Sequence, residues 1–196
     1  MPEKLKEYIS KRDFKKTGEP DGTMGVGKRQ ANEEDALRFV VQHHIASRDH
    51  NDFRLEWRGA LLSWAVPKGP SFDPADKRLA VRVEDHPLDY RNFEGTIPRG
   101  QYGGGTVMLW DEGFWLPLGD AGEGMEKGSF KFYLIGIRLK GKWALVKLPE
   151  DEKRKGDNWL LCKERDEYAL KGAGIGDYAV SVRSGLTMEE IGRNKL

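Results

Sequence analysis

Three of the four histidines in this chain lie within the eight residues from His43 to His50, and Asp52 follows shortly after. In an extended strand, side chains alternate between two faces, so His50 and Asp52 lie on the same face. Imidazole nitrogens and carboxylate oxygens are common ligands of divalent transition metals. This short segment therefore predicts a metal site.

A hairpin would bring a third ligand to the same place. Residues 39–44 have the pattern of a strand, and a turn centred on Ser47 would fold them against residues 50–57. In that register three facing pairs occupy one side of the sheet: His44 with His50, Gln42 with Asp52, and Val40 with Arg54. Two histidines and one carboxylate leave open coordination positions, as catalytic sites do, and suit either Mn²⁺ or Zn²⁺. The competing interpretation is an ordinary polar face of a sheet.

Basic and phenolic side chains follow downstream. Lys68 lies in a turn between Pro67 and Gly69, and Tyr90 follows His86 at a short distance in the sequence. Strand alternation over residues 78–86 predicts that the apolar residues 79, 81 and 83 pack behind one polar face, made of Arg78, Arg82, Glu84 and His86. Arginine binds phosphate through paired hydrogen bonds and lysine as a point charge. We expect a phosphate-binding cleft beside the metal, although a surface salt bridge would explain any one of these residues.

The bulk properties exclude several classes of function. The 196 residues fit a single domain, and 33 basic against 32 acidic residues give a net charge of only +1. Such a balance disfavours a protein that coats DNA and favours an enzyme that contacts a few phosphates at an end. Neither a membrane-spanning run nor an apolar leader is present, so we expect a cytoplasmic protein. The single cysteine, Cys162, cannot form an internal disulfide.

Short apolar runs separated by glycine and proline indicate strands over residues 39–44, 53–62, 79–83, 106–110, 129–137, 143–148 and 159–162. This series predicts a mostly β fold, a compact antiparallel β-barrel with short flanking helices. We expect helical segments over residues 4–10 and 33–38, and a C-terminal helix after Thr187, which has capping-box spacing with Glu190. Residues 100–105 lead into a strand, so we expect a bend there and no phosphate-binding loop. Residues 149–156 are expected to form a solvated loop.

Ordered blocks along nearly the whole chain resemble the 3′-phosphoesterase module of bacterial non-homologous end-joining DNA ligase D and its stand-alone archaeal and bacterial versions. They include SWAVPKGP at 63–70, EDHPLDY at 84–90, and the blocks at 11–14, 39–42, 52–56, 78–81 and 93–95. The resemblance implies a barrel with flanking helices. It also implies an activity that removes a 3′-terminal ribonucleoside from a primer strand and then the remaining 3′-phosphate, which leaves a 3′-hydroxyl.

The resemblance also implies roles for individual residues. Three of them would bind Mn²⁺: His44, His50 and Asp52. A second set would surround the scissile phosphate: Arg54, Lys68, Arg78, His86 and Tyr90. Supporting roles are implied for Arg12, Asp13, Glu19 and Gln42. The expected organisation is an N-terminal helix and extended arm over residues 1–35, which packs over the site, and a phosphoesterase barrel over residues 36–196.

The chain departs from the family pattern beside the metal ligands. Asn51 stands where an aromatic residue is usual, and Asp49 stands where an apolar residue is usual. Because Asn51 points away from the ligand face, we expect altered packing or substrate contact with the metal retained.

The implied partners are nucleic acid 3′ ends, such as a primer-template that carries a terminal ribonucleotide or a 3′-phosphate. A ligase, a polymerase or Ku would act in trans. One rival function is a non-haem iron oxygenase, because His50, Asp52 and His86 imitate a two-histidine, one-carboxylate triad. A second rival is a non-catalytic end-binding accessory of a repair ligase.

Overall fold

The fold is taken from a computed structural model, which describes residues 3–22, 37–150, 156–174, 176 and 178–193. Within these ranges a single sheet contains the strands β1 (Leu37–Ile45), β2 (Asp49–Trp57), β3 (Ala60–Val66), β4 (Lys77–His86), β5 (Gly95–Ile97), β6 (Gly105–Leu118), β7 (Ser129–Gly136), β8 (Lys140–Lys147) and β9 (Asn158–Lys163). The short helical segments are η1 (Glu3–Leu5), α1 (Lys6–Ser10), η2 (Leu88–Asn92), α2 (Ala121–Glu126) and α3 (Met188–Arg193). None of these helices is long and apolar enough to span a membrane.

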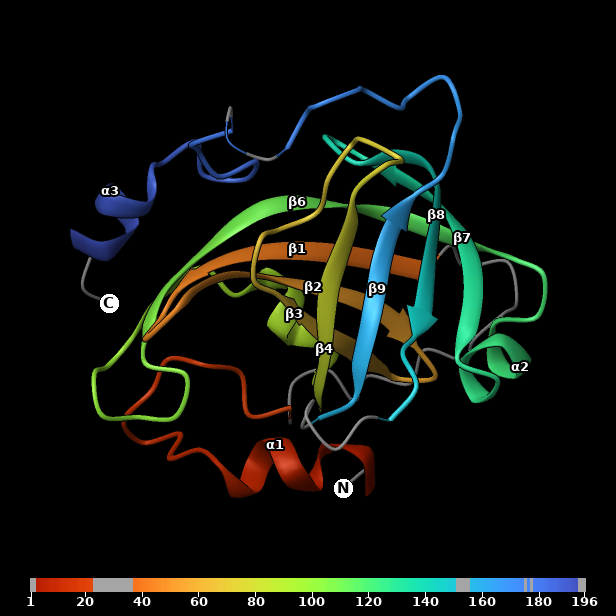
Figure 1. The fold of residues 1–196 in the computed structure, drawn as a ribbon. Coiled ribbons are helices and arrows are strands. Elements are labelled where there is room, and N and C mark those ends of the chain that lie inside the picture. Colours follow the sequence, from red (N-terminus) through yellow and green to blue (C-terminus); the bar gives the residue numbers. More distant parts are fainter. Residues whose placement is uncertain (1–2, 23–36, 151–155, 175, 177, 194–196) are drawn as a thin grey trace.

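The strands close into an antiparallel barrel (Figure 1). The order around it is β1-β2-β3-β4-β9-β8-β7-β6, and pairing of β6 with β1 closes the circle. The short strand β5 adds to the other edge of β6. Helix α1 lies below the barrel near the end of β4, and α2 lies beside β7. The predicted mostly β fold, a barrel with short flanking helices, is confirmed.

A large aromatic core fills the barrel. Phe53, Trp64, Trp115 and Trp143 are all at most 1% exposed and belong to one cluster that unites residues from β1 to α3. A second, smaller cluster lies on the outer side of the β1–β3 region and is made of Tyr8, Leu61, Tyr90, Phe93, Ile97 and Val107. The barrel interior is therefore packed, and the second cluster lies on the outer side, where the polar residues of β1 and β2 are.

The β1–β2 hairpin has the register expected from the sequence. Ile45 pairs with Asp49 across the turn, which is followed by the pairs His44 with His50, Gln42 with Asp52, and Val40 with Arg54. Phe39, Val41, Phe53 and Leu55 point into the main core. The alternation of the strands consequently places the even-numbered polar residues together on the outer face.

Two predicted strands have different bounds. Residues 53–62 form no single strand, because Arg58 (φ 49°) and Gly59 (φ 82°) make a tight turn between β2 and β3. Two successive positive φ angles are typical of the two-residue turn that joins twisted strands. The strand predicted over residues 106–110 extends to Leu118, because Gly113 lets a neighbouring strand approach closely. A Cβ at this glycine would lie 2.1 Å from the Ile135 carbonyl oxygen.

The predicted polar face of β4 is wrong. Between Ser63, which pairs with Val83, and Leu61, which pairs with His86, β4 contains one residue more than β3. This β-bulge reverses the alternation, so Arg82 lies over the ring of Trp64 on the core side, whereas His86 points outward. Arg78 shares the inner face with Ala80 and is separated from His86. The apolar residues do not pack behind them, since Leu79 is 41% exposed.

The predicted helical ends have different outcomes. The helix expected near the N-terminus is present as η1 and α1, and the Thr187–Glu190 capping box is confirmed. Its Glu190 carboxylate accepts the Thr187 backbone N–H at 2.8 Å, and the Thr187 hydroxyl accepts the Glu190 backbone N–H at 3.3 Å. A helical turn was expected over residues 33–38. Residues 37 and 38 belong instead to strand β1, and residues 33–36 lie outside the described residues. The predictions for residues 23–35 and 151–155 also lie outside them.

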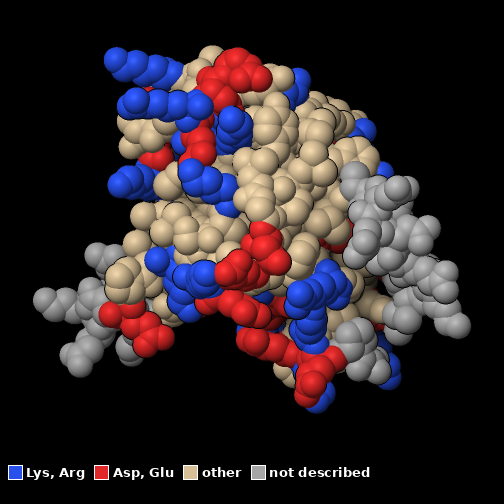
Figure 2. Space-filling view, turned by 90° about the vertical axis from the view of Figure 1, so that its right-hand side faces the viewer, with Lys and Arg blue, Asp and Glu red and all other residues tan. Residues whose placement is uncertain are grey.

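Charged side chains are unevenly spread over the surface. Figure 2 views the side that carries β7 and α2 in Figure 1, where charged groups gather toward the margins around a broad area without them. Exposed apolar side chains on β6 and β7 include Leu116 (44%), Leu118 (45%) and Ile135 (49%). The metal-site residues described next belong to a different part of the barrel, the outer face of β1 and β2.

Candidate active site

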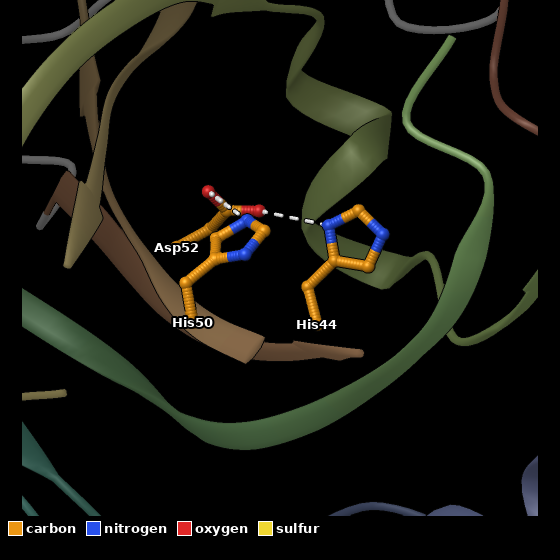
Figure 3. Close-up of side chains that lie close together, drawn as sticks. All are labelled: His44, His50 and Asp52. Carbon is orange, nitrogen blue, oxygen red and sulfur yellow. Dashed lines mark ion pairs between the residues drawn. The ribbon is translucent and has the colours of Figure 1, made fainter. Parts of the chain in front are cut away.

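Backbone carbonyls orient both histidines of the hairpin. His44 Nε2 lies 2.9 Å from the Gly103 carbonyl oxygen, and His50 Nδ1 lies 2.9 Å from that of Arg48. A carbonyl only accepts hydrogen bonds, so each of these nitrogens carries a proton, and the other nitrogen of each ring is the one left to bind a metal. Those other nitrogens face Asp52, at 3.7 Å for His44 Nδ1 and 3.6 Å for His50 Nε2 (Figure 3).

Three ligand atoms, one from each of these residues, lie within 4.8 Å of one another. Two ligand atoms that bind one ion with bonds of about 2.0 to 2.2 Å lie at most about 4.4 Å apart. The two separations from Asp52, 3.7 and 3.6 Å, fall within that limit, and small side-chain shifts would bring all three atoms onto one ion. Burial raises the pKa of Asp52, but the Arg54 guanidinium and the two imidazoles lower it more strongly, so the carboxylate is ionised. The donor set therefore fits a divalent transition metal, and each imidazole already has the outer hydrogen bond typical of metal-binding histidines.

Arg54 connects the metal-binding group to the rest of the site. Its Nη2 donates to Asp52 Oδ2 at 2.9 Å, and its Nε donates to Gln42 Oε1 at 2.8 Å. Its Nη1 lies 3.0 Å from His86 Nδ1. The side chain is buried, so these contacts fix the plane of the guanidinium. Gln42 is held in turn by the backbone carbonyls of Tyr90 and Phe93, to which its Nε2 donates at 3.0 and 2.9 Å.

His86 lies between two guanidinium groups. Arg54 approaches its Nδ1, and Arg12 Nη2 lies 3.4 Å from its Nε2. Burial lowers the pKa of His86 well below the usual value, and the positive charges of Arg54 and Arg12 lower it further. The imidazole is therefore neutral at neutral pH. Among the described residues, the metal-binding group does not include His86, so the triad expected for an iron oxygenase from His50, Asp52 and His86 does not form.

The N-terminal arm reaches the site through a buried ionic network. Arg12 Nε donates to Glu19 Oε1 at 2.9 Å, and Arg12 Nη1 donates to Glu84 Oε1 at 3.2 Å. The Tyr90 hydroxyl donates to the same Glu19 oxygen at 3.2 Å. Burial and the Glu19 carboxylate raise the pKa of Tyr90 well above the usual value, so the phenol keeps its proton. The described part of the arm, residues 3–22, thus contacts the groups that surround His86.

Three residues of the expected site lie elsewhere. Asp13 is bonded within its own turn, where it accepts the Lys15 backbone N–H at 3.2 Å and faces Lys16 Nζ at 3.0 Å. Arg78 donates to Asp76 Oδ2 at 2.7 Å on the inner side of β4. Lys68 follows the end of β3 and lines a cavity on the side of the hairpin opposite to the metal ligands. Contact of Lys68 and Arg78 with the scissile phosphate, and a supporting role for Asp13, remain predictions.

Several residues that support the site were not predicted from the sequence. Glu84 receives hydrogen bonds from Arg12, Lys11 and the Tyr102 hydroxyl, and Gly103 supplies the carbonyl that orients His44. The polar face predicted for β4 contained a signal for Glu84. A backbone carbonyl, by contrast, leaves no signature in the residue type, so Gly103 could be found only from the fold.

Comparisons with known proteins agree with this geometry. Residues 42–147 match the family described as the DNA Ligase D 3′-phosphoesterase domain. The chain is similar to the multifunctional non-homologous end joining protein LigD of Pseudomonas aeruginosa, with 53% identity over 165 residues, which cover 84% of this chain and 19% of that protein. It is also similar to the multifunctional non-homologous end joining DNA repair protein LigD of Mycobacterium tuberculosis, with 39% identity over 171 residues, 87% of this chain and 21% of that protein.

The chain spans about a fifth of the length of these relatives. The segment that matches the family covers more than half of the chain. It includes His44, His50 and Asp52 as well as the Arg54 and His86 that adjoin them. The chain belongs to the family of DNA ligase D 3′-phosphoesterase domains.

Proposed function

We propose that the chain is a metal-dependent phosphoesterase that heals nucleic acid 3′ ends. It removes a 3′-terminal ribonucleoside and then the remaining 3′-phosphate, and it leaves a 3′-hydroxyl. The observation that carries the proposal is the arrangement of His44 and His50, each with one ring nitrogen on a backbone carbonyl and the other directed at the Asp52 carboxylate. Membership of the phosphoesterase family supports this activity over the oxygenase and the non-catalytic accessory.

His44, His50 and Asp52 would hold Mn²⁺, with Zn²⁺ or another divalent transition metal as the alternative ion. Such an ion, when bound, polarises a phosphoryl oxygen and lowers the pKa of water. The ionised Asp52 supplies negative charge, and the two imidazoles complete a set that leaves further coordination positions for substrate.

Arg54 would bind the phosphoryl group. A guanidinium has five N–H donors, and the bonds to Asp52 and Gln42 occupy two of them, which leaves Nη1, beside His86, and the second Nη2 hydrogen for phosphoryl oxygens. Because the guanidinium is fixed before substrate arrives, it stabilises negative charge that grows on those oxygens without reorganisation. His86 would hydrogen-bond the same phosphate as a neutral imidazole, since two adjacent guanidinium groups oppose its protonation.

The outer residues would hold the strand around this centre. Arg12 and Glu19 keep the N-terminal arm against His86 and Tyr90, and Tyr90 would orient the phosphate through that network. Lys68 and Arg78 would contact phosphates of the strand further from the metal. The substrates would be DNA ends that carry a terminal ribonucleotide or a 3′-phosphate, and the proposed partners are a ligase, a polymerase or Ku, in the cytoplasm.

The direct test offers a 5′-labelled primer-template with one 3′-terminal ribonucleotide to the full chain, with Mn²⁺ or with a chelator. We expect the strand first to lose one nucleoside, which leaves a 3′-phosphate, and then to lose that phosphate, which leaves a 3′-hydroxyl, both only with the metal. Asp52→Asn should abolish both steps. Asp120→Asn, which alters the N-cap of α2 far from the site, is the matched control and should retain them.

Other outcomes would select another function. A ladder that runs many nucleotides inward would identify an ordinary exonuclease. Shortening that persists after chelation would exclude the metal-dependent mechanism. Absence of any cleavage, together with tight and specific binding of the end, would favour the accessory role.

A further inference from the structure

A cavity of about 460 Å³ lies at one end of the barrel, on the inner side of the β1–β2 hairpin. Its lining includes His43, Asp49, Asn51, Lys68, Trp110 and Tyr178. Tyr178 packs edge-on against Trp110, with ring centroids 5.7 Å apart. Nearby, the Val182 backbone N–H donates to the Leu109 carbonyl at 3.0 Å, which ties the C-terminal segment to β6. The volume falls in the range of small-molecule binding sites.

The cavity shares its strands with the metal-binding group. His43 and Asn51 form a facing pair in the hairpin, and each is next in sequence to a metal ligand, His44 or Asp52. Successive side chains of a strand point to opposite faces, so the cavity and the metal-binding group lie on opposite faces of the same two strands. Residues 49 and 50 extend past Val66, the last residue of β3, and Lys68 lies beside this open edge. A strand held at the metal therefore passes close to the cavity.

Asn51 is the residue that points to a ligand. It is only 2% exposed, and its Nδ2 is buried without a hydrogen-bond partner among the described residues. Leaving a buried amide donor unpaired costs about 1 to 3 kcal/mol. An amide that lines a cavity and lacks a partner is suited to the donor and acceptor edge of a nucleobase, which asparagine recognises with paired hydrogen bonds.

The remaining lining fits the same class of ligand. Tyr178 is 39% exposed and provides an aromatic surface on which a base can pack, and Trp110 lies buried against it. Lys68, exposed at the rim, offers a point charge for a phosphate that adjoins the base. We infer that this cavity binds a nucleobase of the strand whose 3′ end is processed, and that Asn51 is the hydrogen-bonding residue. This inference rests on the proposed function for its choice of strand.

The test measures binding in a chelator, so that it does not depend on phosphoesterase activity. Fluorescence anisotropy gives the dissociation constant of the full chain for a single-stranded oligonucleotide with a 3′-phosphate. The oligonucleotide is then replaced by versions with an abasic nucleotide at each of the last few positions. We expect one position at which removal of the base weakens binding about tenfold, the loss of roughly one good hydrogen bond.

Variants of residues that line the cavity test whether that base binds there. Asn51→Leu should bind the intact oligonucleotide about tenfold more weakly and should no longer distinguish it from the abasic version. Tyr178→Leu, at a half-exposed position, is a second cavity variant for the case that Asn51→Leu does not fold. Tyr133→Leu makes the same change outside the cavity, on β7, and should keep the base dependence.

Two results would overturn the inference. In the first, no position of the oligonucleotide depends on its base. In the second, a folded Asn51→Leu or Tyr178→Leu variant keeps the full dependence. Failure of the proposed function is separable, since a chain that binds one base in the cavity but never releases phosphate would contradict only the phosphoesterase assignment.

Discussion

The Arg54 guanidinium contacts the Asp52 carboxylate, the Gln42 amide and the His86 imidazole, and each contact constrains the direction of its remaining N–H groups. Lysine has one ammonium group and cannot reproduce this planar set of donors. We predict that Arg54→Lys lowers kcat/KM about 100- to 1000-fold at saturating Mn²⁺, as expected for a lost transition-state donor.

Steady-state kinetics of 3′-phosphate release check this value. Arg38→Lys is the matched control, because Arg38 lies over the ring of Phe114 and away from the site. Activity of Arg54→Lys within threefold of the unaltered protein would show that Arg54 has no direct role in catalysis.

The neutral state of His86 has a measurable consequence for stability. Its pKa in the folded chain is far below the value of about 6.5 expected in the unfolded chain. As the pH falls below 6.5, the unfolded chain therefore binds a proton that the folded chain does not, and the free energy of unfolding decreases. Above pH 6.5 His86 is neutral in both the folded and the unfolded chain, so the free energy of unfolding is not reduced by this proton there.

We predict that His86→Gln, which cannot bind this proton, loses less stability between about pH 6.5 and 5 than the unaltered protein. Urea unfolding in a chelator at the two pH values measures the difference. Equal losses in both proteins would mean that His86 is not held in its neutral form by Arg54 and Arg12.

At the scale of elements, the β1–β2 hairpin and the loop before β6 together create the metal-binding group. The hairpin could be predicted from sequence, because alternation and a short turn define both the faces and the register of an antiparallel pair. The bulge in β4 could not be predicted from the sequence, because assigning alternate residues to alternate faces assumes that the strand pairs without an extra residue. For the same reason Arg78 was expected beside His86. The contact between Arg12 and Glu84 joins residues 72 positions apart and has no local signal.

The loop before β6 requires a glycine at its contact with β1. Gly105 has φ 154°, and a Cβ there would lie 2.2 Å from the Ile45 carbonyl oxygen. Because backbone atoms cannot yield as a flexible side chain can, Gly105→Ala should displace the loop that contains Gly103. We predict a loss of stability of about 1 to 3 kcal/mol and weaker Mn²⁺ binding, since His44 loses its orienting carbonyl.

Calorimetric titration with Mn²⁺ and thermal unfolding check both effects. Gly100→Ala is the control, because Gly100 also has a positive φ of 86° but no atom within 4 Å of the added Cβ. It should lose about 1 kcal/mol of stability and retain metal affinity. Unchanged metal affinity in a destabilised Gly105→Ala would contradict the role of the loop in orienting His44.

At the scale of the whole molecule, the N-terminal arm is attached to the barrel through buried charges. Arg12 bridges Glu19 of the arm and Glu84 of β4, and all three side chains are at most 4% exposed. Replacement of Arg12 by Gln would leave Glu19 buried without its cationic partner. Removal of one member of a buried pair typically costs about 3 to 5 kcal/mol.

We therefore predict that Arg12→Gln is destabilised by about 3 to 5 kcal/mol in urea unfolding. Lys16→Gln, which breaks an exposed pair with Asp13, is the control and should change stability by about 0.5 kcal/mol or less. A similar small effect for Arg12→Gln would mean that the arm is not held by this network. The arm would then be unable to position Tyr90 and His86.

The central claim is that His44, His50 and Asp52 hold one divalent ion on the outer face of the β1–β2 hairpin. Anomalous X-ray scattering from a crystal of the full chain soaked in Mn²⁺ tests it most directly. We predict one strong peak about 2.0 to 2.2 Å from His44 Nδ1, His50 Nε2 and an Asp52 oxygen. A manganese peak elsewhere, or none at these atoms in an active enzyme, would contradict it.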